Sequence, residues 1–279
     1  MAFTNTINEV ITKSKMEHVA PSIFSESAKG KLTQRYNFIP TITVVNELEK
    51  SGWLPVKATE CLVRDEKNQG YQKHMIRFRN FDEGMGEKLE VGDCFMEMVL
   101  TNSHDGLSSF IFNLGLFRLA CSNGMVVSES CFDSARIRHN SYNATRVLDI
   151  CNDVATNAPR LLENVQKMDA IELTPDEQGV FASAARTVRF GESDVSTEAI
   201  LHPRRYSDTG NSLWKTFNRV QENLEKGGIQ YWKKRDDGIM SFPRRSKTRE
   251  VKGIDSGMRL NQALWQLAEE MAKLKTATA

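Results

Sequence analysis

The sequence lacks any run of about 18 apolar residues, the length a helix needs to cross a bilayer, so no membrane-spanning segment is predicted. Its first residues, MAFTNTINEVITKSKMEH, hold no continuous apolar stretch, which argues against a secretory signal peptide. No CxxC pair occurs, and the cysteines are odd in number and scattered (Cys61, Cys94, Cys121, Cys131 and Cys151). That pattern argues against a disulfide framework and a zinc ribbon, so we expect a protein of the reducing cytoplasm.

The common catalytic signatures are also missing. The chain contains no GxxxxGK[ST], no GxGxxG after a strand, no HExxH and no GxSxG motif. Its five histidines are far apart, and none has a histidine or cysteine partner at a familiar metal-ligand spacing. We therefore expect no metal and no cofactor, and an enzyme is the less favoured class.

Charge of one sign is not in excess either. The 279 residues carry 37 Lys and Arg against 36 Asp and Glu, a formal net charge of +1. A chain of this length can bury a substantial core without disulfides or metals. Any attraction to nucleic acid must come from a local concentration of charge.

The first half of the chain has the pattern of an antiparallel sheet. Apolar and polar residues alternate over residues 56–64, 72–80, 90–100 and 108–116, and a short helix is predicted over 41–50 with Thr41 able to cap it. In the second strand, Met75, Arg77 and Arg79 share one face. These arginines could grip phosphate, or they could form cross-strand ion pairs on a solvated face.

The second half has helical spacing. Residues 142–168 repeat apolar side chains every three or four positions, and Pro159 is expected to break or kink that helix. Thr174 and Pro175 open a helix that ends at Gly191, residues 191–210 read as a loop, and Asn211 or Ser212 caps a helix that ends at Gly227. Asp255 or Ser256 should cap the last one.

We therefore predict an α+β protein, with an N-terminal curved antiparallel sheet and a short helix, followed by a helical C-terminal half packed against it. The expected division is 1–140 and 141–279, within one domain or as two.

Residues 100–128 mix core-forming and site-forming residues most densely. His104 and Asp105 lie in a run of turn formers, Asn-Ser-His-Asp-Gly. They fit an acid–base pair or metal ligands, whereas turn chemistry alone would have Asp105 cap the turn and His104 bind backbone. Cys94 and Cys121 fit buried core residues better than nucleophiles. We favour the structural interpretation of both pairs.

The motif LTNSHDG…F…GLFRLACSNGMVV, with IRHN after it, resembles the DUF932 family associated with phages and plasmids. The stretches LWKTFNRVQENLEKGG and VKGIDSGMRLNQALWQLAEEMA look like the C-terminal half of that family. The resemblance covers most of the chain. It implies residence on phages, prophages and plasmids in a bacterial cytoplasm, and leaves the role open.

Basic residues gather at three places. Arg136, Arg138 and His139 lie together in an extended segment, and Arg204 and Arg205 precede an aromatic residue. Residues 230–252 carry eight Lys and Arg against three acids (basic: Lys233, Lys234, Arg235, Arg244, Arg245, Lys247, Arg249 and Lys252). Tyr231 and Trp232 are interleaved with them. Cations for phosphates and rings for base stacking are the features of a single-stranded nucleic-acid surface, whereas a solvated hairpin is the structural alternative.

The leading hypothesis is an accessory protein that binds nucleic acid, single-stranded DNA in particular, in recombination, replication or evasion of host defence. Its expected contacts are Arg136, Arg138, Arg204, Arg205, Tyr231, Trp232, Lys233, Lys234, Arg235, Arg244 and Arg245. A second hypothesis is an enzyme acting on a phosphate-containing substrate through His104, Asp105 and His139. A third is an inhibitor of a host defence factor. The sequence leaves the oligomeric state open, a homo-oligomer included.

Overall fold

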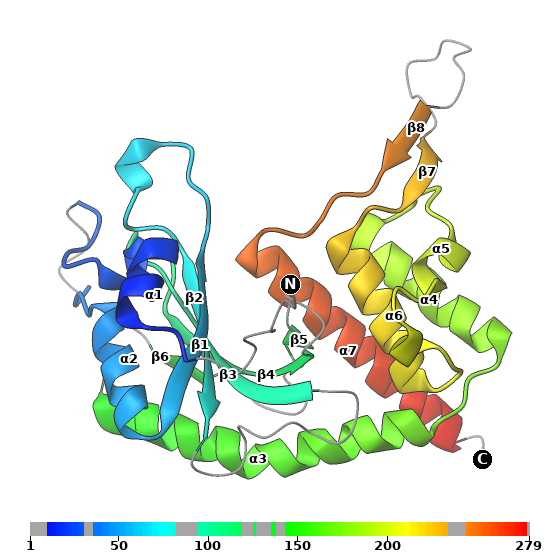
Figure 1. Ribbon diagram of the computed structural model, residues 1–279, viewed down its shortest axis with the longest axis horizontal. Helices are drawn as coiled ribbons and strands as arrows, with labels where there is room; N and C mark the ends of the chain where they lie inside the picture. Colours follow the sequence, from blue (N-terminus) through cyan, green and yellow to red (C-terminus); the bar gives the residue numbers. More distant parts are fainter. Residues whose placement is uncertain are drawn as a thin grey trace, which may run out of the picture. The chain divides into compact units, whose positions relative to one another are not determined.

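The computed structural model describes residues 10–30, 36–81, 94–118, 125–126, 135–137, 143–233 and 244–277 (Figure 1). The chain divides into two compact units, residues 1–159 (unit 1) and 160–279 (unit 2). The division falls inside α3 (Ala144–Ala170). Unit 1 holds an antiparallel sheet and unit 2 is mainly helical, so the α+β class predicted from the sequence is confirmed.

The sheet of unit 1 follows the chain order. Its first four strands pair antiparallel, each with the next: β1 (Trp53–Glu60), β2 (His74–Asn80), β3 (Cys94–Asn102) and β4 (Phe110–Arg118). Two short strands, β5 (Met125–Val126) and β6 (Ala135–Ile137), pair with different stretches of β4. Strands that follow one another in the chain commonly pair as neighbours, which accounts for this order.

One face of the sheet is the apolar core of unit 1. Ile76, Leu100 and Phe112 are in register across three strands, and each is completely buried. The helix α2 (Thr41–Lys50) adds Val44, Val45 and Leu48 to the buried set, and α1 (Lys13–Val19) adds Met16. The alternation of side chains along each strand thus separates this core from the opposite face.

The opposite face carries a buried ion triad. Arg77 and Arg79 lie on one face of β2, as the sequence predicts, and both donate to the Glu97 carboxylate on β3. The Arg79 Nη2 to Glu97 Oε1 distance is 2.5 Å. Glu97 is completely buried and Arg79 is 2% exposed. The cross-strand ion pairs that were considered therefore form, but the face that carries them is buried and not solvated.

Unit 2 confirms two of the predicted helix starts. The helix α4 (Pro175–Phe190) has a reciprocal capping box between Thr174 and Glu177, and Gly191 ends it. The helix α6 (Leu213–Lys226) is capped by the Ser212 side chain, 3.2 Å from the Lys215 backbone nitrogen, and Gly227 ends it. Trp214 and Phe217 of α6 stack on each other in the core between α6 and α7. Trp265 of α7 (Ile254–Ala277) packs edge-on against both rings.

Three local predictions differ from the structure in whole or in part. The expected loop over 191–210 contains a short helix, α5 (Thr197–Leu201), which the Ser196 side chain caps and the buried Ile200 anchors. Pro159 lies inside the continuous helix α3, so the expected break does not occur, because one missing hydrogen bond does not end a helix this long; the expected kink stays a prediction. The last helix begins at Ile254, so its expected caps, Asp255 and Ser256, are already helical.

Thr41 also has a different role from the expected one. Pro40 occupies the N-cap position of α2 and no side chain caps that helix. The Thr41 hydroxyl instead lies 2.8 Å from His74 Nε2 and 3.1 Å from His104 Nε2, and Asn102 Nδ2 donates to it at 3.0 Å. Thr41 is completely buried, and its hydroxyl contacts residues far along the chain and does not cap α2.

Candidate functional site

A two-stranded hairpin carries much of the basic segment predicted in the sequence. Its strands β7 (Gln230–Lys233) and β8 (Arg244–Lys247) pair antiparallel, with Trp232 opposite Arg245 and Gln230 opposite Lys247. Because directly opposite residues share a face, as do residues two apart on a strand, these four lie on the same face. We call Gln230, Trp232, Arg245 and Lys247 the stacking face.

The stacking face exposes an indole beside two cations. Trp232 is 61% exposed, whereas Trp53, Trp214 and Trp265 are each 2% exposed or less. Arg245 and Lys247 are also exposed, and Arg245 Nη2 donates to Gln230 Oε1. An exposed ring flanked by positive charge is suited to stack on a base while a cation meets its phosphate.

The base of the hairpin is fixed to the end of α6. The Gly228 nitrogen donates to Thr248 O at 2.9 Å, and the Ile229 nitrogen donates to Thr248 Oγ1 at 3.0 Å. The Val251 nitrogen donates to Glu225 O at 2.8 Å. The hairpin is therefore held in a defined direction relative to α6.

Gly227 makes this junction possible. Its φ is 60° and its ψ is −146°, and an added Cβ would lie 2.6 Å from the Arg249 carbonyl carbon. Gly191 ends α4 with nearly the same angles, φ 63° and ψ −143°, yet its Cβ would meet nothing within 4 Å. The two glycines share one backbone conformation and differ in the space beside them.

We expect Gly227→Ala to lower the free energy of unfolding by roughly 2 kcal/mol, part of it from backbone strain and part from the clash. Gly191→Ala is the matched control, because it carries the strain without the clash. Urea denaturation of both variants measures the difference. Equal losses would mean that the close approach of residues 227 and 249 contributes nothing.

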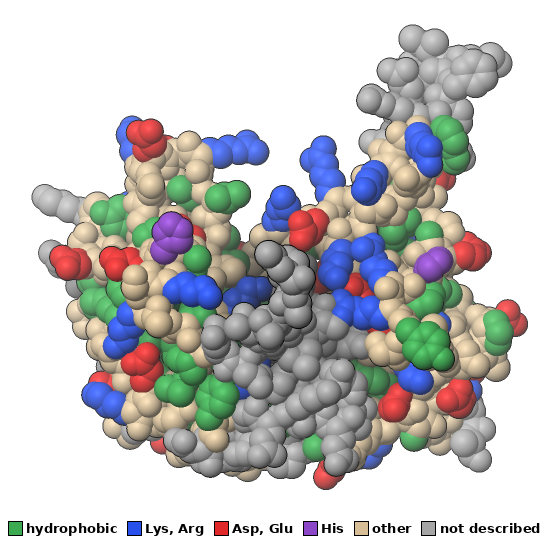
Figure 2. All heavy atoms as spheres, in the orientation of Figure 1, with side chains coloured by type: hydrophobic (Ala, Val, Ile, Leu, Met, Phe, Trp, Pro, Cys, Tyr) green, Lys and Arg blue, Asp and Glu red, His purple; other side chains and the backbone are tan. Residues whose placement is uncertain are grey.

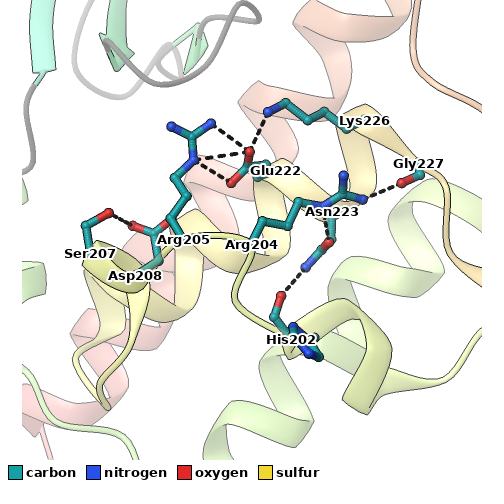
Figure 3. A network of polar contacts seen from close by, with 9 residues as sticks. All are labelled: His202, Arg204, Arg205, Ser207, Asp208, Glu222, Asn223, Lys226 and Gly227. Carbon is teal, nitrogen blue, oxygen red and sulfur yellow. Dashed lines mark hydrogen bonds and ion pairs between the residues drawn. The ribbon is translucent and has the colours of Figure 1, made fainter.

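Arg204 and Arg205 both contact residues of α6, and Arg204 also donates to the Gly227 carbonyl (Figure 3). Arg205 Nη2 donates to Glu222 Oε1 at 2.7 Å, and its Nε is 3.1 Å from Glu222 Oε2. Lys226 Nζ donates to the same carboxylate at 2.5 Å. Two cations thus share one buried acid, Glu222.

The Glu222 carboxylate is held in its ionised form. Burial tends to raise its pKa, but hydrogen bonds and charges from Arg205 and Lys226 outweigh burial and lower the pKa below its usual range. An ionised carboxylate can fix both cations near neutral pH. Figure 2 shows Lys and Arg side chains along the hairpin and over the adjoining end of α6.

The other predicted contacts are placed as follows. Arg136 lies exposed in β6 of unit 1, and Tyr231 lies half-buried in β7. Lys233 and Arg244 are paired residues of the hairpin strands. Arg138, His139, Lys234 and Arg235 lie outside the described residues. Unit 2 therefore holds all of the predicted contacts that the structure describes except Arg136: Arg204, Arg205, Tyr231, Trp232, Lys233, Arg244 and Arg245.

His104 and Asp105, the candidate acid–base pair, both make contacts that stabilise the local fold. His104 is completely buried, and its backbone nitrogen donates to Tyr71 O at 3.0 Å. Asp105 Oδ1 accepts hydrogen bonds from Ser103 Oγ at 2.5 Å and from the Leu107 nitrogen at 3.0 Å, which is turn capping. Burial and the Asp105 charge raise the pKa of Tyr36 to about 12, so this phenol stays protonated.

Sequence reasoning missed the polar cluster around His104. Ser22 Oγ lies 2.9 Å from His74 Nδ1, and the Thr41 hydroxyl joins His74 to His104. Its members come from four separate stretches of the chain, so no local spacing could reveal it. Among the described residues, no group of three or more His, Cys, Asp or Glu side chains is arranged to hold a metal ion. No helix in that part of the chain is long and apolar enough to cross a membrane.

Comparison with known proteins identifies relatives over nearly the whole chain. The model of a domain of unknown function, DUF932, matches residues 29–265. The UPF0380 protein YafZ of Escherichia coli (strain K12) is 38% identical over 263 residues, 94% of this chain and 91% of that protein. The UPF0380 protein YfjQ of the same organism is 37% identical over the same length and shares of both chains. No solved structure matches the chain.

Proposed function

This chain belongs to the DUF932 family, and we propose that it is an accessory protein of phages and plasmids that binds single-stranded DNA. The stacking face carries the proposal: an indole 61% exposed, opposite one cation and close to a second. A large aromatic ring at the surface contributes little to a core and is available to a partner. The association with phages and plasmids comes from the family resemblance.

The composition of this face favours nucleic acid over other anionic partners. Cations alone would attract any polyanion, whereas a ring among cations adds stacking with a flat base. Single strands fit better than duplex, because the faces of paired bases are covered by their neighbours in the stack. The alternative enzyme would need a substrate to reach His104, whose side chain is completely buried.

Fluorescence anisotropy with a labelled single-stranded oligonucleotide tests the proposal. We expect Trp232→Ala to weaken binding by roughly 5–150-fold, the equivalent of about 1–3 kcal/mol for one stacked base. Trp232→Phe keeps a ring and should retain most of the affinity. Lys273→Gln on α7 removes an exposed cation far along the sequence from the hairpin and should bind as the wild type does.

Tryptophan fluorescence gives a second readout on the same titration. Three of the four tryptophans are buried, so an oligonucleotide that stacks on the protein should quench Trp232 selectively. The quenching should vanish in Trp232→Phe although binding persists. Absence of binding to single strands or duplex at low salt would overturn the proposal.

A further inference from the structure

Two cations from distant parts of unit 2 meet over Gly228. The position that a Cβ on Gly228 would occupy lies 3.9 Å from Arg204 Nη2 and 3.9 Å from Lys247 Nζ. The two nitrogens are therefore separated by no more than twice that distance. Arg204 precedes α6 and Lys247 ends β8, so the fold brings them together.

The hydrogen bonds that Arg204 makes within the described residues go to neutral acceptors. Arg204 Nε donates to the Asn223 side-chain oxygen at 2.6 Å, and its Nη2 donates to the Gly227 carbonyl, so both of its acceptors are neutral. The Lys247 side chain makes no hydrogen bond or ion pair with the described residues. Like charges held this close repel each other, and an anion between them would convert the repulsion into attraction.

The Arg204 side chain is held in place before any ligand arrives, and the backbone position of Lys247 is fixed by strand pairing. Asn223 Nδ2 donates to the carbonyl oxygens of Ile200 at 2.7 Å and His202 at 2.8 Å, which fixes the amide that orients Arg204. The register of β8 against β7 places Lys247 opposite Gln230. Gly228 has no side chain to fill the space where the charged ends converge, and its φ of 84° favours glycine.

We propose that Arg204 and Lys247 form a phosphate-binding site over Gly228. The guanidinium supplies directed N–H donors and the ammonium supplies a mobile point charge, a combination suited to the oxygens of one phosphate group. Lys247 also belongs to the stacking face, two residues along β8 from Arg245. That the phosphate belongs to the strand stacked on Trp232 rests on the proposed function; a free phosphate is the other source of the same chemistry.

The salt dependence of oligonucleotide binding tests whether the two side chains share one phosphate. For a single strand, removing one phosphate neutralised by the protein reduces the slope of log affinity against log salt by about 0.7. We expect Arg204→Gln, Lys247→Gln and the double variant Arg204→Gln/Lys247→Gln each to show the same reduction, about 0.7, because both side chains are needed to hold the one phosphate. An Arg204→Gln variant with the wild-type slope would mean that Lys247 acts alone. Trp232→Phe and Lys273→Gln should keep the wild-type slope. A double variant with an unchanged slope, or with twice the reduction, would overturn the shared site.

Inorganic phosphate separates this inference from the proposed function. At equal ionic strength, phosphate should raise the melting temperature of the wild type more than chloride does, and Lys247→Gln should remove the difference. If phosphate stabilises the wild type while no oligonucleotide binds, the site holds and the proposed function fails. If oligonucleotides bind while phosphate has no effect and the slopes are unchanged, the proposed function stands and the shared site fails.

Discussion

Glu97→Gln should lower the free energy of unfolding by about 3–5 kcal/mol, the cost of breaking a buried ion pair by removing one partner. Glu97 is completely buried and accepts from Arg77 and Arg79, whose side chains are 10% and 2% exposed. The substitution keeps the size of the side chain and removes the negative charge that both guanidiniums share. Since small domains are stable by about 5–15 kcal/mol, this loss is a large fraction of the total stability.

The same substitution at a solvated ion pair provides the control. Glu270 pairs with Lys273 at 2.6 Å, and both side chains are mostly exposed, so Glu270→Gln should unfold with the wild-type midpoint. Urea denaturation of the two variants, followed by circular dichroism, compares them directly. If Glu97→Gln were no less stable than Glu270→Gln, the triad would contribute little to folding.

The sequence predicted best what depends on neighbouring residues. Thr174 and Pro175 mark the start of α4 because the capping hydroxyl and the proline act within one turn. The alternation around Arg77 predicts the face on which it lies because side chains alternate along any strand. Both signals are local, and both were confirmed.

Contacts across the chain could not be predicted in this way. Arg77 and Arg79 were recognised as neighbours, but the register that brings Glu97 against them follows from the pairing of β2 with β3. The meeting of Arg204 with Lys247 depends on how α6 and the hairpin join at Gly227 and Gly228. Sequence analysis therefore identified basic residues without identifying which of them share an acid and which face each other.

Thr41→Val should lower the free energy of unfolding by about 2–4 kcal/mol, because a buried hydroxyl with three polar partners is replaced by a methyl group. A hydroxyl donates one hydrogen bond and accepts two. Asn102 Nδ2 donates to it, and His74 Nε2 and His104 Nε2 are its other partners, so the hydroxyl is fully used. Valine has nearly the same shape, so the loss reports the polar contacts.

Two controls isolate the hydroxyl. Thr43→Val makes the same change at an exposed position of α2 and should leave stability near that of the wild type. Thr41→Ser keeps the hydroxyl and should recover most of the loss, short of about 1 kcal/mol for the missing methyl group. Urea midpoints of the three variants are sufficient to rank them.

The sign of the Thr41→Val effect also separates the two interpretations of His104. Catalytic groups are commonly held in arrangements that cost stability, so removing one tends to leave a protein unchanged or more stable. A cluster that exists to join α2 to β2 and β3 has the opposite signature, because each of its members contributes to folding. A loss of the expected size would place His74 and His104 in the framework of unit 1. A gain in stability would instead favour a catalytic role for His74 and His104.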